Sequence, residues 1–321
     1  MSHSGSPVSN ITAPPTASVG GPGLGSVLDP VTGRYYHAWH KGQYLFPCDE
    51  DERDRLDIFH KFFLIARKDR LFSAPIVPDR DGPRILDLGT GTGIWAVDVA
   101  DQFRTGEVRG TDLSMMQPSA IPPNLRFIPA DMESPWYGLG EDSWDLIHMR
   151  TLSGSVTSWP HLYAKVFAHL KPMYGFIEHV EIDWEPRSDD GPVPPRYRDW
   201  VADLYNAMDT FGRSMRIERD GIKNSLAAVG FVDITEESIR IPINGWPADP
   251  HEKDMGEWFN LGLTFGLPGL TYGAFSKVLG KSKDEMDRIV NDVKRDITNR
   301  SYHAYCTLYI WNARRPGPSG R

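Results

Sequence analysis

Three glycines follow an apolar segment at alternating positions, a pattern that suits ligand binding. Residues 84–88 (Arg-Ile-Leu-Asp-Leu) predict a strand, residues 94–103 predict a helix, and the loop between them carries Gly89, Gly91 and Gly93. Glycine permits positive φ and lets a ligand lie against the backbone, while free amides at a helix N-terminus bind ligand oxygens. Since open α/β sheets bind ligands at the carboxyl ends of their strands, the loop predicts a ligand site.

Two classes of cofactor fit this loop. Residues 91–96 (Gly-Thr-Gly-Ile-Trp-Ala) match the dinucleotide fingerprint with alanine in the last place. Asp112 lies 19 residues after Gly93 and would suit the ribose of a nicotinamide cofactor or of S-adenosylmethionine. A nicotinamide-dependent oxidoreductase is therefore the alternative that the loop leaves open.

Three features favour S-adenosylmethionine. Asp87 precedes the glycines, where a carboxylate could engage the ammonium group of the cofactor directly or through water. Asp131 and Met132 follow the third predicted strand, where adenine needs an acceptor for its amino group and an apolar side chain against its face. The chain also ends without a second mononucleotide-binding half. The expected cofactor-binding residues are Asp87, Gly89, Gly91, Gly93, Asp112, Leu113, Asp131, Met132 and His148.

Strands alternate with helices through the middle of the chain, which predicts a parallel sheet covered on both faces. The expected strands are 84–88, 108–112, 125–128, 144–149 and 174–182, followed by a sixth at 238–243. The pattern resembles the α/β fold of class I methyltransferases, a Rossmann-like sheet with helices on both faces. That resemblance implies an antiparallel last strand, and the sequence adds helical insertions after strands five and six.

The composition divides the chain into a tail and one large domain. Residues 1–33 are rich in Ser, Pro, Gly and Thr and predict a disordered tail, because they cannot bury enough apolar surface to offset their ordering entropy. A single domain is expected over 34–315, with a flexible end at 316–321. Its expected parts are an aromatic segment and helix at 34–70, a core at 84–185, insertions at about 190–230 and 246–299, and a final strand at 303–313.

Charge and cysteine content exclude several classes of protein. The 321 residues carry a formal net charge of -8, which argues against a broad basic surface for direct nucleic-acid binding. Two cysteines are too few for a disulfide framework, and no metal site is expected. No apolar run approaches the length of a membrane span, and no hydrophobic signal region precedes the domain. The expected compartment is the nucleus or the cytosol.

Candidate catalytic residues lie near the carboxyl ends of the fourth and fifth predicted strands. Methyl transfer from a sulfonium is an in-line displacement, and a general base helps when the acceptor loses a proton. The candidates are His148, Glu178 and His179, with Glu181 beside them, although His148 could instead face the core. No Asn/Asp-Pro-Pro-aromatic loop and no cysteine follows strand four, so the acceptor stays open among protein side chains, small molecules and the protein itself.

Longer strings of residues resemble one family of methyltransferase-like regulators, the LaeA-like proteins of filamentous fungi. The strings are 36–37, 44–50, 55–61, 91–95, 133–136, 141–148, 167–172, 180–183 and 303–305. Two departures are visible. Thr90 stands where many relatives carry cysteine, and residues 149–153 diverge at the position where methyl acceptors are usually handled.

The resemblance implies a regulatory role that composition and spacing do not supply. It implies a nuclear subunit of the velvet complex that works with velvet-domain proteins of the VeA and VelB type, with the cytoplasm as a second location. It also implies control of secondary-metabolite gene clusters, development and sporulation. A non-catalytic interaction subunit that keeps its cofactor pocket is the alternative within the same resemblance.

Overall fold

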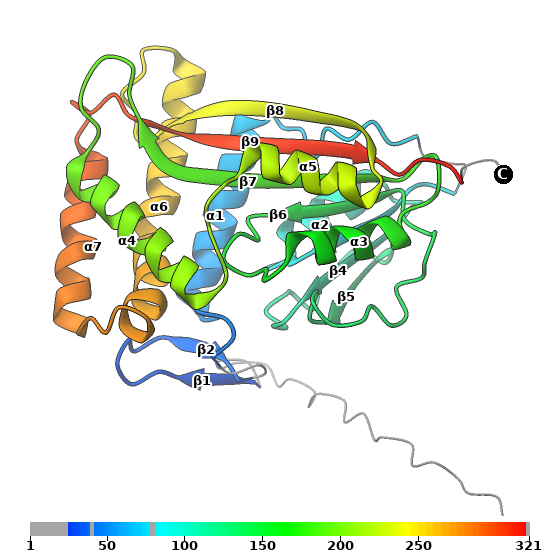
Figure 1. Ribbon diagram of the computed structural model, residues 1–321, viewed down its shortest axis with the longest axis horizontal. Coiled ribbons are helices and arrows are strands. Elements are labelled where there is room, and N and C mark those ends of the chain that lie inside the picture. The colour runs from blue at the N-terminus through cyan, green and yellow to red at the C-terminus, as the bar shows by residue number, and fades with distance from the viewer. Residues whose placement is uncertain (1–24, 39–41, 78–80, 319–321) are drawn as a thin grey trace, which may run out of the picture.

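The computed structural model describes residues 25–38, 42–77 and 81–318, and a seven-stranded sheet forms its centre (Figure 1). The strands lie in the order β5-β4-β3-β6-β7-β9-β8, with β9 antiparallel to both of its neighbours and the other pairs parallel. The fold class predicted from the sequence is therefore confirmed. The strands are β3 (Arg84–Leu88), β4 (Glu107–Asp112), β5 (Leu125–Pro129), β6 (Leu146–Arg150), β7 (Phe176–Arg187), β8 (Val232–Pro242) and β9 (Tyr305–Arg314).

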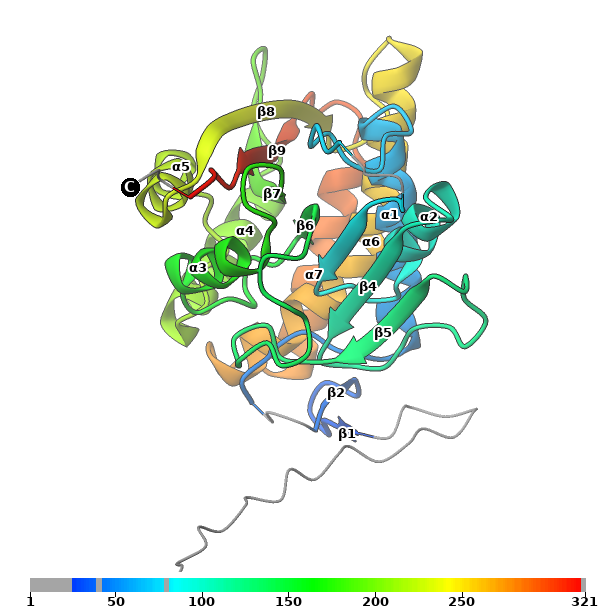
Figure 2. The ribbon, with the colours of Figure 1, turned by 90° about the vertical axis from the view of Figure 1, so that its right-hand side faces the viewer.

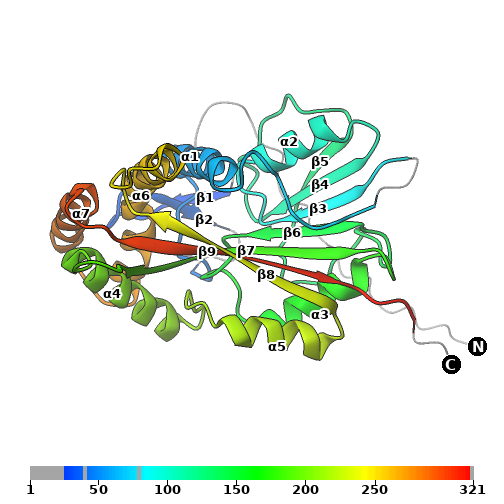
Figure 3. The same cartoon turned by 90° about the horizontal axis from the view of Figure 1, so that it is seen from above.

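Helices cover both faces of the sheet (Figure 3). One face carries α1 (Glu50–Ala66) and α2 (Ile94–Gln102), and the other carries α3 (Trp159–His169) and α5 (Arg219–Val229). Because successive side chains of a strand point to opposite faces, Ile85 packs with the apolar side chains of α2 while Leu86 packs with those of α3. The central strands β3 and β6 are thus buried on both sides, which accounts for their largely apolar sequences.

Three helices of the two insertions form a second group beside the sheet. The insertion after β7 carries α4 (Pro195–Phe211) and α5, and the insertion after β8 carries α6 (Pro250–Lys277) and α7 (Lys283–Thr298). Helices α4, α6 and α7 share one apolar core with α1 and with parts of β7, β8 and β9. The insertions therefore extend the domain and bring α6 against α1.

Four glycines on one stripe of α6 allow this close approach. A Cβ atom at any of them would lie within 3.0 Å of an atom of α1 or of the segment before it. Only hydrogen at these positions lets the backbones come so near. The pairs are Gly262 with Phe59, Gly266 with Arg55, Gly269 with Glu52, and Gly273 with the carbonyl oxygen of Leu45.

Several boundaries differ from the sequence prediction, such as the end of β7 at Arg187, and two of the differences have a clear physical reason. Strand β1 (Ser26–Leu28) pairs antiparallel with β2 (Tyr35–His37), so ordered structure begins inside the predicted tail, whose residues 1–24 lie outside the described part. The ion pair of Arg34 with Asp49 fastens the hairpin to the start of α1. Strand β8 begins six residues before the predicted Ser238, because this edge strand alternates exposed polar residues with partly buried ones. The polar composition of residues 232–237 is not typical of a strand, so the sequence did not predict this part of β8.

Candidate functional site

A cavity lies at the carboxyl ends of β3, β4, β5 and β6. Figure 2 shows the arrowheads of β4 and β5 pointing toward the β1–β2 hairpin, whose residue His37 borders the cavity. The space inside it, including its open mouth, is about 1420 Å³. Its wall on the sheet side includes Gly89, Gly91, Asp112, Leu113, Asp131 and Met132, and its roof includes His37, Tyr44, Phe46, Arg55, Phe59 and Phe63.

The glycine loop forms a cradle that side chains would fill. Gly89 and Gly91 have φ angles of +66° and +56°, and both border the cavity. A Cβ at Gly89 would lie 2.4 Å from Leu152, and one at Gly91 would lie 3.1 Å from Leu56. Gly93 also has positive φ, but its hydrogen faces the ring of Phe127 outside the cavity. Two of the three predicted glycines therefore lie in the wall, and the third supports them.

Asp112 lies at the end of β4 in the middle of the wall. Its carboxylate accepts hydrogen bonds from the backbone N–H groups of Gly91 at 2.8 Å and Ser114 at 3.0 Å. Desolvation inside the cavity raises the pKa of Asp112 to about 6, against the lowering effect of those two hydrogen bonds. A carboxylate in this position can accept the two hydroxyl groups of a ribose.

Asp131 and Met132 lie together after β5. The Asp131 carboxylate accepts from the Glu133 N–H and the Ser134 hydroxyl, each at 2.8 Å, which fixes the turn that presents both residues to the cavity. Leu113 also borders the cavity. The wall thus offers a carboxylate and apolar side chains at the place where an adenine was predicted.

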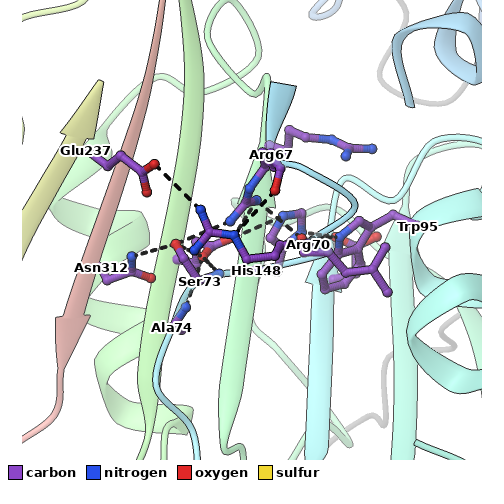
Figure 4. Close-up of polar contacts among 12 residues, drawn as sticks. Arg67, Arg70, Ser73, Ala74, Trp95, His148, Glu237 and Asn312 are labelled. Carbon is purple, nitrogen blue, oxygen red and sulfur yellow. Dashed lines mark hydrogen bonds and ion pairs between the residues drawn. The ribbon is translucent and has the colours of Figure 1, made fainter. Parts of the chain in front are cut away.

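Asp87 and His148 lie beneath the glycine loop and do not border the cavity. His148 Nδ1 lies 2.8 Å from Asp87 Oδ1, and the Thr90 hydroxyl donates to Asp87 Oδ2 at 2.6 Å. The imidazole stacks on Trp95 with ring centroids 3.7 Å apart (Figure 4). Both oxygens of Asp87 are therefore occupied within the chain. Thr90 has a structural role, since its hydroxyl ties the loop to the strand.

Glu178 joins the sheet to the end of α1. Its carboxylate accepts from Arg67 Nη1 at 2.8 Å and from the Ser73 and Ala74 N–H groups at 2.6 and 3.1 Å. Figure 4 shows Arg67, Ser73 and Ala74 gathered around this point, close to His148. Burial alone would raise the pKa of Glu178, but the adjacent guanidinium of Arg67 holds it below its usual range.

His179 is likewise enclosed in the core. Its Nδ1 lies 3.0 Å from the Tyr163 hydroxyl, and its Nε2 lies 3.1 Å from Glu181 Oε1. Glu181 does border the cavity, and Oε1 also accepts from the N–H groups of Leu152 and Ser153. The cavity wall therefore includes Glu181 but none of the three predicted catalytic residues, and their contacts are those of buried structural partners.

Within residues 25–38, 42–77 and 81–318, no three His, Cys, Asp or Glu side chains come together in a way that could hold a metal ion. The same part of the chain contains no helix that is long and apolar enough to cross a membrane.

Comparisons with known proteins assign the chain to a family. A model described as a methyltransferase domain matches residues 58–236. The secondary metabolism regulator LAE1 of Cochliobolus heterostrophus is 51% identical over 289 residues, which cover 88% of this chain and 94% of that protein. The protein belongs to the LaeA family of methyltransferases.

Other LaeA-family proteins show the same relation. The secondary metabolism regulator laeA of Aspergillus flavus is 46% identical over 88% of this chain and 76% of its own length. A relative from Emericella nidulans, named protein-methionine methyltransferase laeA, is 42% identical over 88% of this chain and 75% of its own length. Among solved structures, Haemonchus contortus phosphoethanolamine N-methyltransferase 2 with S-adenosyl-L-methionine has a TM-score of 0.46, with 16% identity over 82% of this chain and 52% of that one.

S-adenosylmethionine is the cofactor of this methyltransferase, and the residues of the cavity fit it. The cradle of Gly89 and Gly91, the carboxylate of Asp112 and the Asp131–Met132 turn lie in the wall where a methionine moiety, a ribose and an adenine were expected. The match to the LaeA family excludes the alternative that the glycine loop alone left open, a nicotinamide-dependent oxidoreductase.

The sequence analysis did not predict most of the roof of the cavity. Part of that roof comes from His37, Tyr44, Phe46 and Arg55 and from Leu270 of α6, which all lie outside the matched methyltransferase segment. Tyr44 is a roof residue, whereas Trp311 is fully buried in the core. The density of aromatic residues before α1 was the available signal, but a sequence alone does not show which ring turns toward a ligand.

Proposed function

We propose that the protein methylates the thioether sulfur of a protein methionine, and that it acts in the nucleus as a regulator of secondary-metabolite gene clusters and development. We further propose that it works in a complex with velvet-domain proteins of the VeA and VelB type. The name of the Emericella nidulans relative supports the methionine acceptor. The names of the other relatives support the regulation of secondary metabolism. The nuclear location and the velvet partners follow from the family resemblance alone.

The observation that carries the acceptor is the position of the three predicted catalytic residues, none of which borders the cavity. The candidate bases His148, Glu178 and His179 are buried in other contacts, and Glu181 already accepts two backbone N–H groups. A thioether loses no proton when it is methylated, so it needs alignment rather than a base. An amine or hydroxyl acceptor would need a proton carrier, and none of the three predicted bases borders the cavity.

S-adenosylmethionine, when bound, supplies a methyl group on a sulfonium. A lone pair of the acceptor sulfur would form the new C–S bond, and the electrons of the old C–S bond would stay on the sulfur of S-adenosylhomocysteine. The positive charge would pass from one sulfonium to the other, so no proton would need to move. Gly89, Gly91, Asp112, Asp131 and Met132 would hold the cofactor, and the roof would hold the acceptor.

The composition of the roof suits a sulfur-containing side chain. Phe46, Phe59, Phe63 and Trp184 border the cavity with Met215. Aromatic rings make favourable contacts with thioether sulfur, and their faces attract the sulfonium that forms.

Labelled methyl transfer tests the proposal. The full chain is incubated with methyl-labelled S-adenosylmethionine and a nuclear extract, with and without purified velvet proteins, and labelled peptides are sequenced by mass spectrometry. We expect the label on methionine as a fixed-charge sulfonium, with more label when velvet proteins are present. Label on lysine, arginine or a small molecule would overturn the methionine acceptor.

The same assay distinguishes a catalytically active methyltransferase from a non-catalytic interaction subunit. A chain that binds S-adenosylhomocysteine and transfers no label under any of these conditions would contradict the proposal in favour of the non-catalytic alternative. An unchanged yield of label with and without velvet proteins would remove the support for that partnership while leaving the chemistry in place.

A further inference from the structure

Three arginines border the cavity, and two of them are already paired with carboxylates. Arg55 donates to Glu52, with Nε 2.9 Å from Oε2, and Arg213 lies 2.9 Å from Glu133 Oε2. Arg150 is different. None of the described residues places a carboxylate oxygen within ion-pair distance of its guanidinium. Asp87, Glu178 and Asp98 act on this guanidinium only from beyond ion-pair distance. A largely buried guanidinium with no direct ion-pair partner is costly, so this one points to an anion that the cavity receives.

The surroundings of Arg150 hold its side chain in one position. The guanidinium lies over the ring of Phe63, with its central carbon 4.4 Å from the ring centroid. Its Nη2 lies 3.5 Å from Nδ1 of His60, whose Nε2 lies 2.8 Å from the Asp98 carboxylate. Burial lowers the pKa of His60, so this imidazole is a neutral acceptor. It orients the guanidinium without neutralising it.

Burial also acts on Arg150 itself. Desolvation lowers the pKa of Arg150 to about 10, with the charge of Asp87 acting in the opposite direction. The side chain therefore stays protonated at neutral pH. It keeps most of its five N–H donors for a ligand, and a planar fork of this kind matches a carboxylate.

The order of the strands indicates which part of the cofactor reaches Arg150. In the sheet order β5-β4-β3-β6, β5 leads to Asp131, β4 ends at Asp112, β3 leads to Gly89 and β6 ends at Arg150. Met149 lies opposite Leu88 in the register, so Arg150 comes directly beside the glycine loop. The cofactor is built in the same order, from adenine through ribose to a methionine moiety. The only carboxylate of the cofactor is on that moiety.

We propose that Arg150 binds the α-carboxylate of the methionine moiety of S-adenosylmethionine. His60 and Asp98 act as positioning residues behind it. The inference rests on S-adenosylmethionine as the cofactor and is independent of which acceptor takes the methyl group. It also replaces the expectation that Asp87 contacts the ammonium directly, since both oxygens of Asp87 are occupied within the chain.

Two ligands that differ in the amino-acid part test this assignment. Calorimetry with S-adenosylhomocysteine and with 5′-methylthioadenosine, which lacks the carboxylate and the amine, is carried out on the wild-type chain and on Arg150→Met. We expect the variant to bind S-adenosylhomocysteine roughly 10- to 100-fold more weakly, as for a lost hydrogen bond to a charged group. Its affinity for 5′-methylthioadenosine should change by less than about twofold.

Arg150→Lys is the second variant, and it keeps the charge while losing the planar fork. We expect it to fall between the wild type and Arg150→Met for S-adenosylhomocysteine, and to match the wild type for 5′-methylthioadenosine. Unchanged affinity for S-adenosylhomocysteine in both variants would overturn the proposal and leave Arg150 to the acceptor. Equal loss for both ligands would also overturn it, because the effect would then be on the fold. A wild-type chain that binds neither ligand would instead contradict the cofactor assignment.

Discussion

The wall and the roof of the cavity are specified in different ways. The wall comes from loops after β3, β4 and β5, and its contacts join residues close to those strand ends, such as Gly91 with Asp112. The roof comes from the segment before α1, from α1 itself and from α6, which lies about 200 residues further along the chain. A local sequence pattern therefore encodes the cofactor side of the cavity. The acceptor side depends on packing between distant segments.

Gly91→Asp changes a residue of the wall, and we expect it to have the largest effect on cofactor binding. The new carboxylate would lie in the cradle, close to the Asp112 carboxylate and to Leu56 of the roof. We expect the affinity for S-adenosylhomocysteine to fall by more than about 100-fold, because like charges and lost space act together. Calorimetry measures the affinity, and circular dichroism checks that the fold is retained.

Gly280→Asp is the matched control for that substitution. Gly280 also has positive φ, at +66°, but an added Cβ there meets nothing within 4 Å. Backbone strain alone would affect both variants equally, so equal affinities in the two would contradict the role of Gly91 in the wall. If Gly91→Asp still restored metabolite-cluster expression in cells, catalysis would not be the essential role.

Glu178→Gln tests the contact between the sheet and α1, since Glu178 pairs with Arg67 at the end of α1. The substitution leaves the buried guanidinium without its counter-charge, which should lower the free energy of unfolding by about 3 kcal/mol. Denaturant unfolding measures this loss. A variant that kept its stability and lost only methyl transfer would restore Glu178 as a catalytic residue.

Gly273→Ala tests how the roof is held. A Cβ at this position would lie 1.9 Å from the carbonyl oxygen of Leu45, so the segment before α1 must move away from α6. We expect a loss of about 2 kcal/mol in the free energy of unfolding, despite the better helix propensity of alanine. Gly221→Ala, at an exposed position of α5, is the control and should be close to neutral. Equal stability of the two variants would contradict the close packing of the roof.

The pH dependence of cofactor binding should be the smallest effect, and it belongs to the wall. Asp112 has a pKa of about 6 in the ligand-free chain, and the ionised form accepts the ribose hydroxyls. The affinity for S-adenosylhomocysteine should therefore be constant above this pH and fall as the pH drops through it, by about tenfold one unit below. Burial lowers the pKa of His37 in the roof to about 4, so His37 does not titrate in this range. A pH profile that is unchanged in Asp112→Asn would show that another group is responsible.

The sequence predicted the wall better than the residues beneath it. Asp112, Asp131 and Met132 were found because each follows a strand that ends at the ligand edge of the sheet. His148 and Glu178 lie on β6 and β7, which are buried on both faces, so no polar alternation shows which side chains reach a cavity. Their partners Asp87 and Arg67 lie 61 and 111 residues earlier in the chain.

The roof could not be predicted for a related reason. The glycines of α6 are visible in the sequence, but their spacing alone does not show that α1 packs against them. The hairpin before α1 depends in the same way on the ion pair of Arg34 with Asp49, which a composition rich in small residues does not reveal. Contacts between distant segments decide both features.

Methyl transfer by Phe46→Leu at saturating S-adenosylmethionine tests most directly whether the roof holds the acceptor. Phe46 borders the cavity beside Met215, and leucine keeps an apolar side chain while removing the ring. We predict that transfer falls roughly tenfold although the cofactor site is full, because the acceptor sulfur loses its aromatic contact and its alignment. Transfer at the wild-type rate would contradict the division of the cavity into a cofactor wall and an acceptor roof.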